Sequence, residues 1–158
     1  MAIEAGQTYI ITNAAPGWVQ YSASVYLPTV LELLKKVKII SARGEFEGKF
    51  PGNYEQWKVH AFLNTEKSLS PEVITNIIAL GDSHVEMVAA HHLASYVFMC
   101  DTNYRRFKDA FIKTVKFREN PTPPELVKQL NLVIQKFPQI SGNAKSLTIR
   151  LERWGEKG

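Results

Sequence analysis

The sequence predicts an α/β fold, a Rossmann-like three-layer sandwich in which helices cover both faces of a mostly parallel sheet. Two observations support this class. Apolar segments alternate between strand-like and helix-like periods along the chain. Residues 74–80 include a continuous apolar run that ends at Gly81, which is typical of a strand buried on both faces. With 158 residues and 45% hydrophobic side chains, the chain can form a single domain over residues 1–158 without a disulfide or a structural metal.

The expected elements follow from the periodicity and from turn residues. Strands are expected at residues 8–13, 37–41, 74–80, 111–117 and 147–151. Helices are expected at residues 19–34, 54–63, 85–97 and 122–137. Pro28 predicts a kink or two short helices in the first of these, because proline lacks an amide donor and clashes with the preceding turn. Residues 43–52, which contain glycines and a proline, are expected to form a loop.

Two further local patterns concern the end of the chain. Thr122 and Glu125 have the spacing of a capping box, and Pro123 stands at the first helical position, so a helix should begin here. Residues 147–151 alternate apolar and polar side chains, which predicts a half-exposed strand at a sheet edge.

Charge and cysteine content narrow the classes of function. Residues 1–100 carry 7 basic and 9 acidic side chains, a net charge of −2, whereas residues 101–158 carry 12 basic and 6 acidic side chains, a net charge of +6. The basic C-terminal third is compatible with anionic partners. A solvated surface is the favoured interpretation, because no basic and aromatic residues interleave as in a specific nucleic-acid-binding motif. The lone Cys100, the lack of an apolar run of about 20 residues and the lack of a signal peptide predict a cytoplasmic protein without a membrane partner.

Polar residues at the carboxyl ends of the predicted strands are the candidates for chemistry, because ligands of open α/β sheets bind there. Asp82 follows the apolar strand directly and Glu86 comes four residues later, a pair that can bind Mg²⁺. Ser83 and Glu86 also have the spacing of a capping box for the next helix. Both interpretations of Glu86 remain open at this point.

Gly81-Asp82-Ser83 also resembles the nucleophile block of the GDSL-type esterases. That chemistry needs a histidine base, which lies near the C-terminus in that family. None of the four histidines lies beyond His92, and the block stands in the middle of the chain. The esterase interpretation is therefore disfavoured.

A second resemblance covers residues 8–140. Thr12-Asn13 after a strand, Lys58 near the start of a helix, and Gly81-Asp82-Ser83-x-x-Glu86 after another strand resemble the second, third and fourth motifs of the haloacid dehalogenase-like (HAD) phosphohydrolase superfamily, in an uncharacterised eukaryotic branch. The resemblance implies that Thr12 and Asn13 contact a phosphoryl oxygen and that Lys58 neutralises its charge. It also implies that Asp82 binds Mg²⁺ with support from Glu86.

The sequence departs from the superfamily at its first motif, Asp-x-Asp on a central first strand. No Asp precedes Asp82, and Glu4 is the only acid before Thr12. The nucleophile and the first central strand are therefore expected to be missing. The neighbouring strands could pair directly, another chain could fill the gap, or these residues could be the C-terminal portion of a longer core. The short segment before Lys58 leaves no room for a cap domain there, which predicts an open site.

These expectations combine into two functional hypotheses. The first is a magnesium-dependent phosphohydrolase-type domain that retains phosphate-binding and metal-binding residues but is inactive as this chain, because it has no Asp nucleophile. The alternative is a non-catalytic binding or assembly module that uses the open sheet and the basic C-terminal third. The corresponding partners are a phosphorylated substrate, and a second copy or another chain that completes the sheet.

Overall fold

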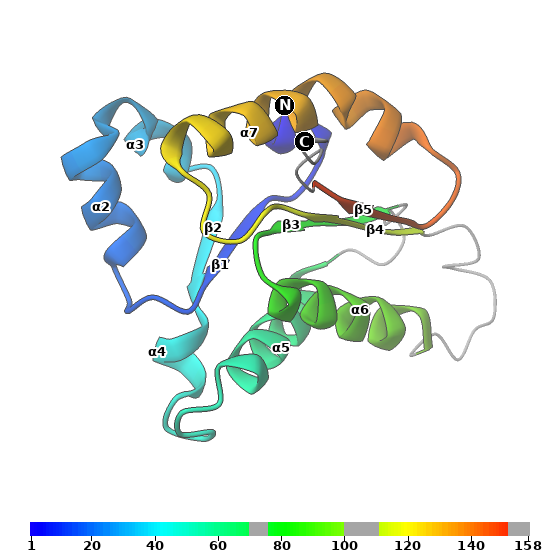
Figure 1. Cartoon of the computed structure of the whole chain (residues 1–158). Coiled ribbons are helices and arrows are strands. Elements are labelled where there is room, and N and C mark those ends of the chain that lie inside the picture. Colours follow the sequence, from blue (N-terminus) through cyan, green and yellow to red (C-terminus); the bar gives the residue numbers. More distant parts are fainter. Residues whose placement is uncertain (70–75, 100–110, 152–158) are drawn as a thin grey trace, which may run out of the picture. The chain divides into compact units, whose positions relative to one another are not determined.

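The computed structural model describes residues 1–69, 76–99 and 111–151 (Figure 1). Cys100 and the first two residues of the strand expected at 74–80 lie outside the described residues. The chain divides into two compact units, an N-terminal unit (Met1–Thr65) and a C-terminal unit (Glu66–Gly158). The single domain over residues 1–158 stays a prediction.

Helices and strands alternate in both units. The elements of the N-terminal unit are α1 (Ala2–Ala5), β1 (Tyr9–Thr12), α2 (Trp18–Tyr26), η1 (Pro28–Val30), α3 (Leu31–Leu34), β2 (Lys38–Ser41), α4 (Ala42–Phe46) and α5 (Tyr54–Thr65). Those of the C-terminal unit are η2 (Glu66–Ser68), β3 (Asn76–Gly81), α6 (His84–Met99), β4 (Phe111–Lys116), α7 (Pro123–Gly142) and β5 (Leu147–Arg150).

The N-terminal unit is built on two parallel strands. β1 pairs with β2 in a register that sets Thr12 opposite Ser41, so the carboxyl ends of both strands meet at one edge. The core beside this sheet consists of side chains from α4 and α5 with apolar side chains of the strands packed against them. Its buried members are Ala42, Phe46, Trp57 and Ala61. This core fixes α5 against the end of β1.

The helical segment around Pro28 confirms one prediction, and the next segment corrects another. α2 ends at Tyr26, a 3-10 turn begins at Pro28, and α3 follows, so the proline separates two short helices. The prediction of a loop at residues 43–52 is wrong for the first half of that segment, where α4 forms. Ser41 is the physical reason, because its side chain accepts a hydrogen bond from the amide of Gly44 at 2.9 Å and caps the helix.

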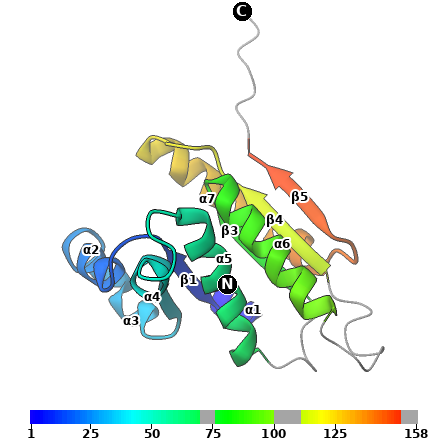
Figure 2. The ribbon, with the colours of Figure 1, turned by 90° about the horizontal axis from the view of Figure 1, so that it is seen from below.

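The C-terminal unit has three layers. Strands β3, β4 and β5 are parallel in the order β3-β4-β5, with Gly81 opposite Lys116 and Lys116 opposite Arg150. Helix α6 covers one face of this sheet and α7 covers the other (Figures 1 and 2). α7 begins as predicted, because Thr122 and Glu125 form a capping box with Pro123 in the first turn.

The burial of the strands corrects a second expectation. The strand expected to be buried on both faces, β3, is only half-buried, with Ala79 buried and Leu80 exposed. The strand with four consecutive buried residues is β4, because it is the central strand of the described sheet whereas β3 has one described neighbour. β5 alternates between half-buried and exposed side chains at the other edge, as predicted.

The fold is therefore α/β with parallel strands in open sheets, consistent with the Rossmann-like layout expected from the sequence. The HAD-like core, the missing central strand and the absence of a cap remain predictions. Among the residues that the structure describes, no helix is both long enough and apolar enough to cross a membrane.

Candidate functional site

Three of the predicted site residues meet at the carboxyl end of β1. Lys58 comes from the first half of α5, and its side chain is 3% exposed. The Lys58 ammonium donates a hydrogen bond to the carbonyl of Ile11 at 2.9 Å, which brings it to the strand end that carries Thr12. Burial of a lysine costs free energy unless polar groups surround its charge. Because the core packs α5 against β1, the fold holds this charge at the strand end.

Thr12 and Asn13 form the turn that follows β1. The Thr12 hydroxyl accepts a hydrogen bond from the amide of Ala14 at 3.1 Å, and Ser41 donates from its hydroxyl to the carbonyl of Ala14 at 2.6 Å. The Asn13 side-chain amide donates to the carbonyl of Tyr54 at 3.4 Å. These contacts tie the turn to β2 and to the start of α5.

One polar atom of this turn has no partner. Asn13 Oδ1 is buried and makes no hydrogen bond within the part of the chain that the structure describes. A buried acceptor without a donor costs about 1–3 kcal/mol. A protonated phosphate oxygen or a hydroxyl group that enters beside Thr12 could supply that donor.

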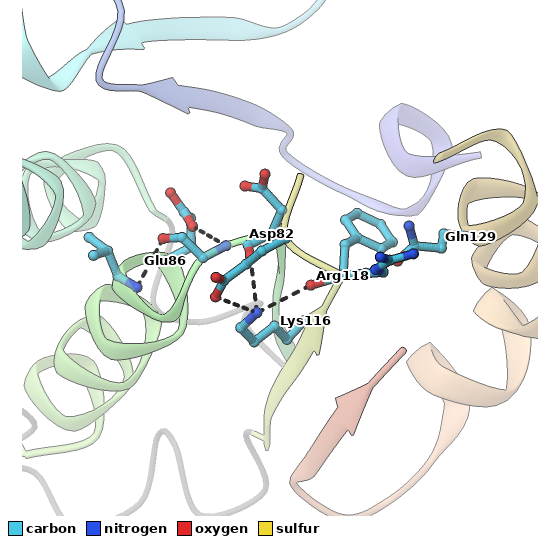
Figure 3. A network of polar contacts seen from close by, with 9 residues as sticks. Asp82, Glu86, Lys116, Arg118 and Gln129 are labelled. Atoms are coloured by element: carbon cyan, nitrogen blue, oxygen red, sulfur yellow. Dashed lines mark hydrogen bonds and ion pairs between the residues drawn. The ribbon is translucent and has the colours of Figure 1, made fainter. Parts of the chain in front are cut away.

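The other two predicted residues, Asp82 and Glu86, belong to the C-terminal unit. They lie at the carboxyl end of β3 and in the first turn of α6 (Figure 3). Glu86 Oε2 accepts from the amide of Ser83 at 3.0 Å, and the Ser83 hydroxyl accepts from the amide of Val85 at 3.1 Å. Glu86 therefore has the capping role that the Ser83-x-x-Glu86 spacing allowed.

Lys116 at the end of β4 is a neighbour of Asp82 that the sequence interpretation missed. Its ammonium donates to the carbonyl of Asp82 at 3.0 Å and forms an ion pair with Glu119 at 3.0 Å. The carboxylate of Asp82 is turned away from Lys116 in Figure 3. The predicted strand at 111–117 contained the signal, because a basic residue near the end of a parallel strand lies at the same sheet edge as Asp82.

The contacts of Asp82 and Glu86 bear on the magnesium site that the resemblance implies. Mg²⁺ takes octahedral oxygen ligands. The helix cap already engages Oε2 of Glu86, whereas Lys116 contacts the backbone carbonyl of Asp82 and not its carboxylate. No group of three or more His, Cys, Asp or Glu side chains among the described residues is arranged to hold a metal ion. Magnesium binding therefore stays a prediction from the resemblance.

Thr12, Asn13 and Lys58 thus converge in the N-terminal unit, while Asp82 and Glu86 converge in the C-terminal unit. No known family model, curated protein or solved structure matches this chain. The chain is accordingly classed by its fold alone, as an α/β protein with parallel open sheets and polar groups at their carboxyl edges.

Proposed function

We propose that this chain is a phosphate-binding α/β domain of HAD-like lineage that does not hydrolyse phosphate esters by itself. The observation that carries the proposal is the Lys58 ammonium, buried at the carboxyl end of β1 and hydrogen-bonded to the carbonyl of Ile11. A cation held by the fold at the end of a parallel strand attracts an anion more strongly than a solvated surface lysine does.

The neighbouring groups supply hydrogen bonds of the kind that a phosphate needs. The Thr12 oxygen accepts from Ala14, which leaves the hydroxyl proton to donate to a phosphate oxygen. Lys58 supplies positive charge, and Asn13 Oδ1 can accept from a protonated phosphate oxygen. Together the three side chains would hold a phosphate monoanion or a phosphate ester.

The absence of hydrolysis follows from the acids available. A phosphoenzyme mechanism of the HAD type needs an Asp nucleophile, and no Asp precedes Asp82 in these 158 residues. Glu4, the only acid before Thr12, is exposed on α1. We therefore expect no turnover of an aryl phosphate in the presence of Mg²⁺. Turnover that disappears in Asp82→Ala would contradict this part of the proposal.

Phosphate binding can be tested on the whole chain by NMR. Inorganic phosphate should shift the amide resonances of Thr12 and Asn13, and Lys58→Met should weaken binding at least about tenfold by removing the charge. Lys36→Met is the matched control, because Lys36 is an exposed lysine of the same unit. Equal affinity in the Lys58→Met protein, with its dispersed spectrum retained, would overturn the proposal.

The same titration tests the magnesium expectation. Because Glu86 caps α6, we expect the affinity for phosphate to be unchanged by Mg²⁺ and by Asp82→Asn. A gain in affinity with Mg²⁺ that Asp82→Asn removes would instead support the metal site implied by the HAD resemblance.

A second function is favoured by a different observation. β3 has one described neighbour, β4, although its sequence Asn76-Ile77-Ile78-Ala79-Leu80-Gly81 is largely apolar. An edge strand of this composition is a template for pairing with another strand. We propose that a second copy of the chain adds its own β3 to this edge, which would make the protein an assembly module.

A further inference from the structure

Basic side chains gather at the carboxyl edge of the sheet in the C-terminal unit. The strand register sets Gly81, Lys116 and Arg150 in one row across β3, β4 and β5. Arg118 follows two residues after Lys116, and His84 begins α6 directly after the turn at the end of β3. Four residues that can carry positive charge are thus collected from distant parts of the chain by the parallel order of three strands.

These residues line a pocket of about 460 Å³. The pocket, called the basic pocket below, is lined by His84, Lys116, Phe117, Arg118, Glu119, Arg150 and Leu151. Its lining contains three permanent cations and one carboxylate. The volume lies within the range of about 300–1,000 Å³ that is usual for small-molecule sites.

Two of the cations are held in place by the protein. Lys116 donates to the carbonyl of Asp82 and pairs with Glu119. The guanidinium of Arg118 pairs with Glu125. The backbone amide of Arg118 donates to Gln129 Oε1 at 2.7 Å, and both residues are labelled in Figure 3. A guanidinium has five N–H donors, so this pairing leaves several of them for a ligand. Positions fixed before binding reduce the entropy lost when an anion binds.

The third cation, Arg150, is the most accessible. It is exposed at the end of the edge strand β5, and no ion pair joins it to a carboxylate of residues 1–69, 76–99 or 111–151. Its guanidinium can form two parallel hydrogen bonds with a phosphate group. The amides of Ser83 and Val85 at the start of α6 contribute less, because the side chains of Glu86 and Ser83 already accept hydrogen bonds from them.

We infer that the basic pocket binds the phosphate groups of a small phosphorylated molecule, with Arg150, Lys116 and Arg118 as the binding residues. Carboxylates already pair with Lys116 and Arg118, so Arg150 supplies the uncompensated positive charge that favours an anion. The concave shape favours a small molecule over an extended polymer. The inference does not rest on the proposed phosphate contact of Lys58, because all the residues that line the basic pocket belong to the C-terminal unit.

Titration of the whole chain with inorganic pyrophosphate, followed by NMR, tests this inference. Amide resonances of Gly81, Arg118 and Leu151 should shift. Arg150→Gln should weaken binding at this pocket at least about tenfold, because it removes one charge-assisted contact from an exposed position. Lys145→Gln, which changes an exposed lysine just before β5, should leave the affinity unchanged within about twofold.

Three outcomes would overturn the inference. The first is equal pyrophosphate affinity in wild type and Arg150→Gln. The second is a set of shifted amides confined to Thr12 and Asn13, which would support the Lys58 site alone. The opposite result, in which the Gly81 and Arg118 shifts are the same in wild type and Lys58→Met and the Thr12 and Asn13 amides do not shift in either protein, would contradict the proposed function and support the basic pocket. The third is tighter binding of a single-stranded RNA than of pyrophosphate, which would indicate a polyanion surface.

Discussion

Lys58 and Glu86 show how the surroundings of a single residue decide what its motif means. Both were singled out by the same resemblance. Lys58 is buried, and its ammonium reaches the end of β1, where a phosphate site would require it. Glu86 instead uses its carboxylate to cap the helix on which it stands. The motif letters alone did not separate these roles, because Glu86 can complete both a capping box with Ser83 and a carboxylate pair with Asp82.

Gly81, next to this cap, supports a prediction at the level of one atom. A Cβ added at Gly81 would lie 2.8 Å from both Cβ and Cγ of Glu86. Gly81→Ala should therefore destabilise the protein by about 1–3 kcal/mol, because either the turn or the capping side chain must move. In urea unfolding, this loss of stability should appear as a lower urea concentration at the midpoint of the transition.

The control for this prediction is Gly142→Ala at the end of α7. A Cβ there meets no atom within 4 Å, so the unfolding midpoint should stay the same or rise, since alanine favours the helix. Equal midpoints for Gly81→Ala and wild type would show that the turn after β3 accommodates the extra atom.

At the level of elements, the sequence predicted the features that depend on local chemistry. The break at Pro28 and the cap formed by Thr122 and Glu125 each depend on neighbours a few residues away, and both are confirmed. The sequence did not predict α4, because the glycines at residues 43–52 indicate a loop. Gly44 is instead needed where α4 packs closely against the turn after β1. A Cβ at Gly44 would lie 2.5 Å from Cγ of Pro16, so this glycine lets the turn after β1 approach α4.

Strand burial and the basic pocket could not be predicted in the same way. An apolar run indicates a buried strand but not its place in the sheet, and here β4 rather than β3 is central. Arg150 stands on the exposed face of an alternating edge strand, a pattern that indicates a solvated surface. Only the register that sets Arg150 beside Lys116 reveals the shared pocket.

The contact between β4 and α7 yields a prediction about pH. Lys113 on β4 is fully buried, and its ammonium donates to the carbonyl of Ser141 in the last turn of α7 at 2.8 Å. Burial lowers the pKa of Lys113 from its ordinary value of 10.5. Between the lowered pKa and 10.5 the unfolded chain therefore binds more protons than the folded chain, and folding stability gained from this residue rises with pH.

The measurement is the free energy of unfolding of wild type and Lys113→Met at about pH 7 and about pH 10. The free energy of unfolding of wild type relative to that of Lys113→Met should be larger at the higher pH. Only wild type has a buried ammonium, and its deprotonation removes the free-energy cost of burying that charge. Lys145→Met, which changes an exposed lysine, should follow the wild-type pH dependence. If the difference in the free energy of unfolding is independent of pH, burial does not lower the pKa of Lys113.

For the whole molecule, the two units share one plan. Each is a parallel sheet with polar residues collected at its carboxyl edge, and each has its own buried core. In each sheet an apolar strand, β1 or β3, has a single described neighbour. Backbone groups at such an edge bind water or another strand. The assembly hypothesis and the missing central strand predicted from the sequence both depend on these edges.

Self-association through β3 is a prediction that sedimentation velocity can test. Two copies related by a two-fold axis would pair their β3 strands antiparallel and give a symmetric dimer. Leu80→Lys should shift the protein to a monomer, because it sets two like charges on one short ladder and a lysine disfavours edge pairing. Leu130→Lys is the matched control: Leu80 and Leu130 are both 42% exposed, but Leu130 lies on α7. Wild-type protein that stays monomeric at all concentrations, or a dimer that persists in Leu80→Lys, would contradict pairing through β3.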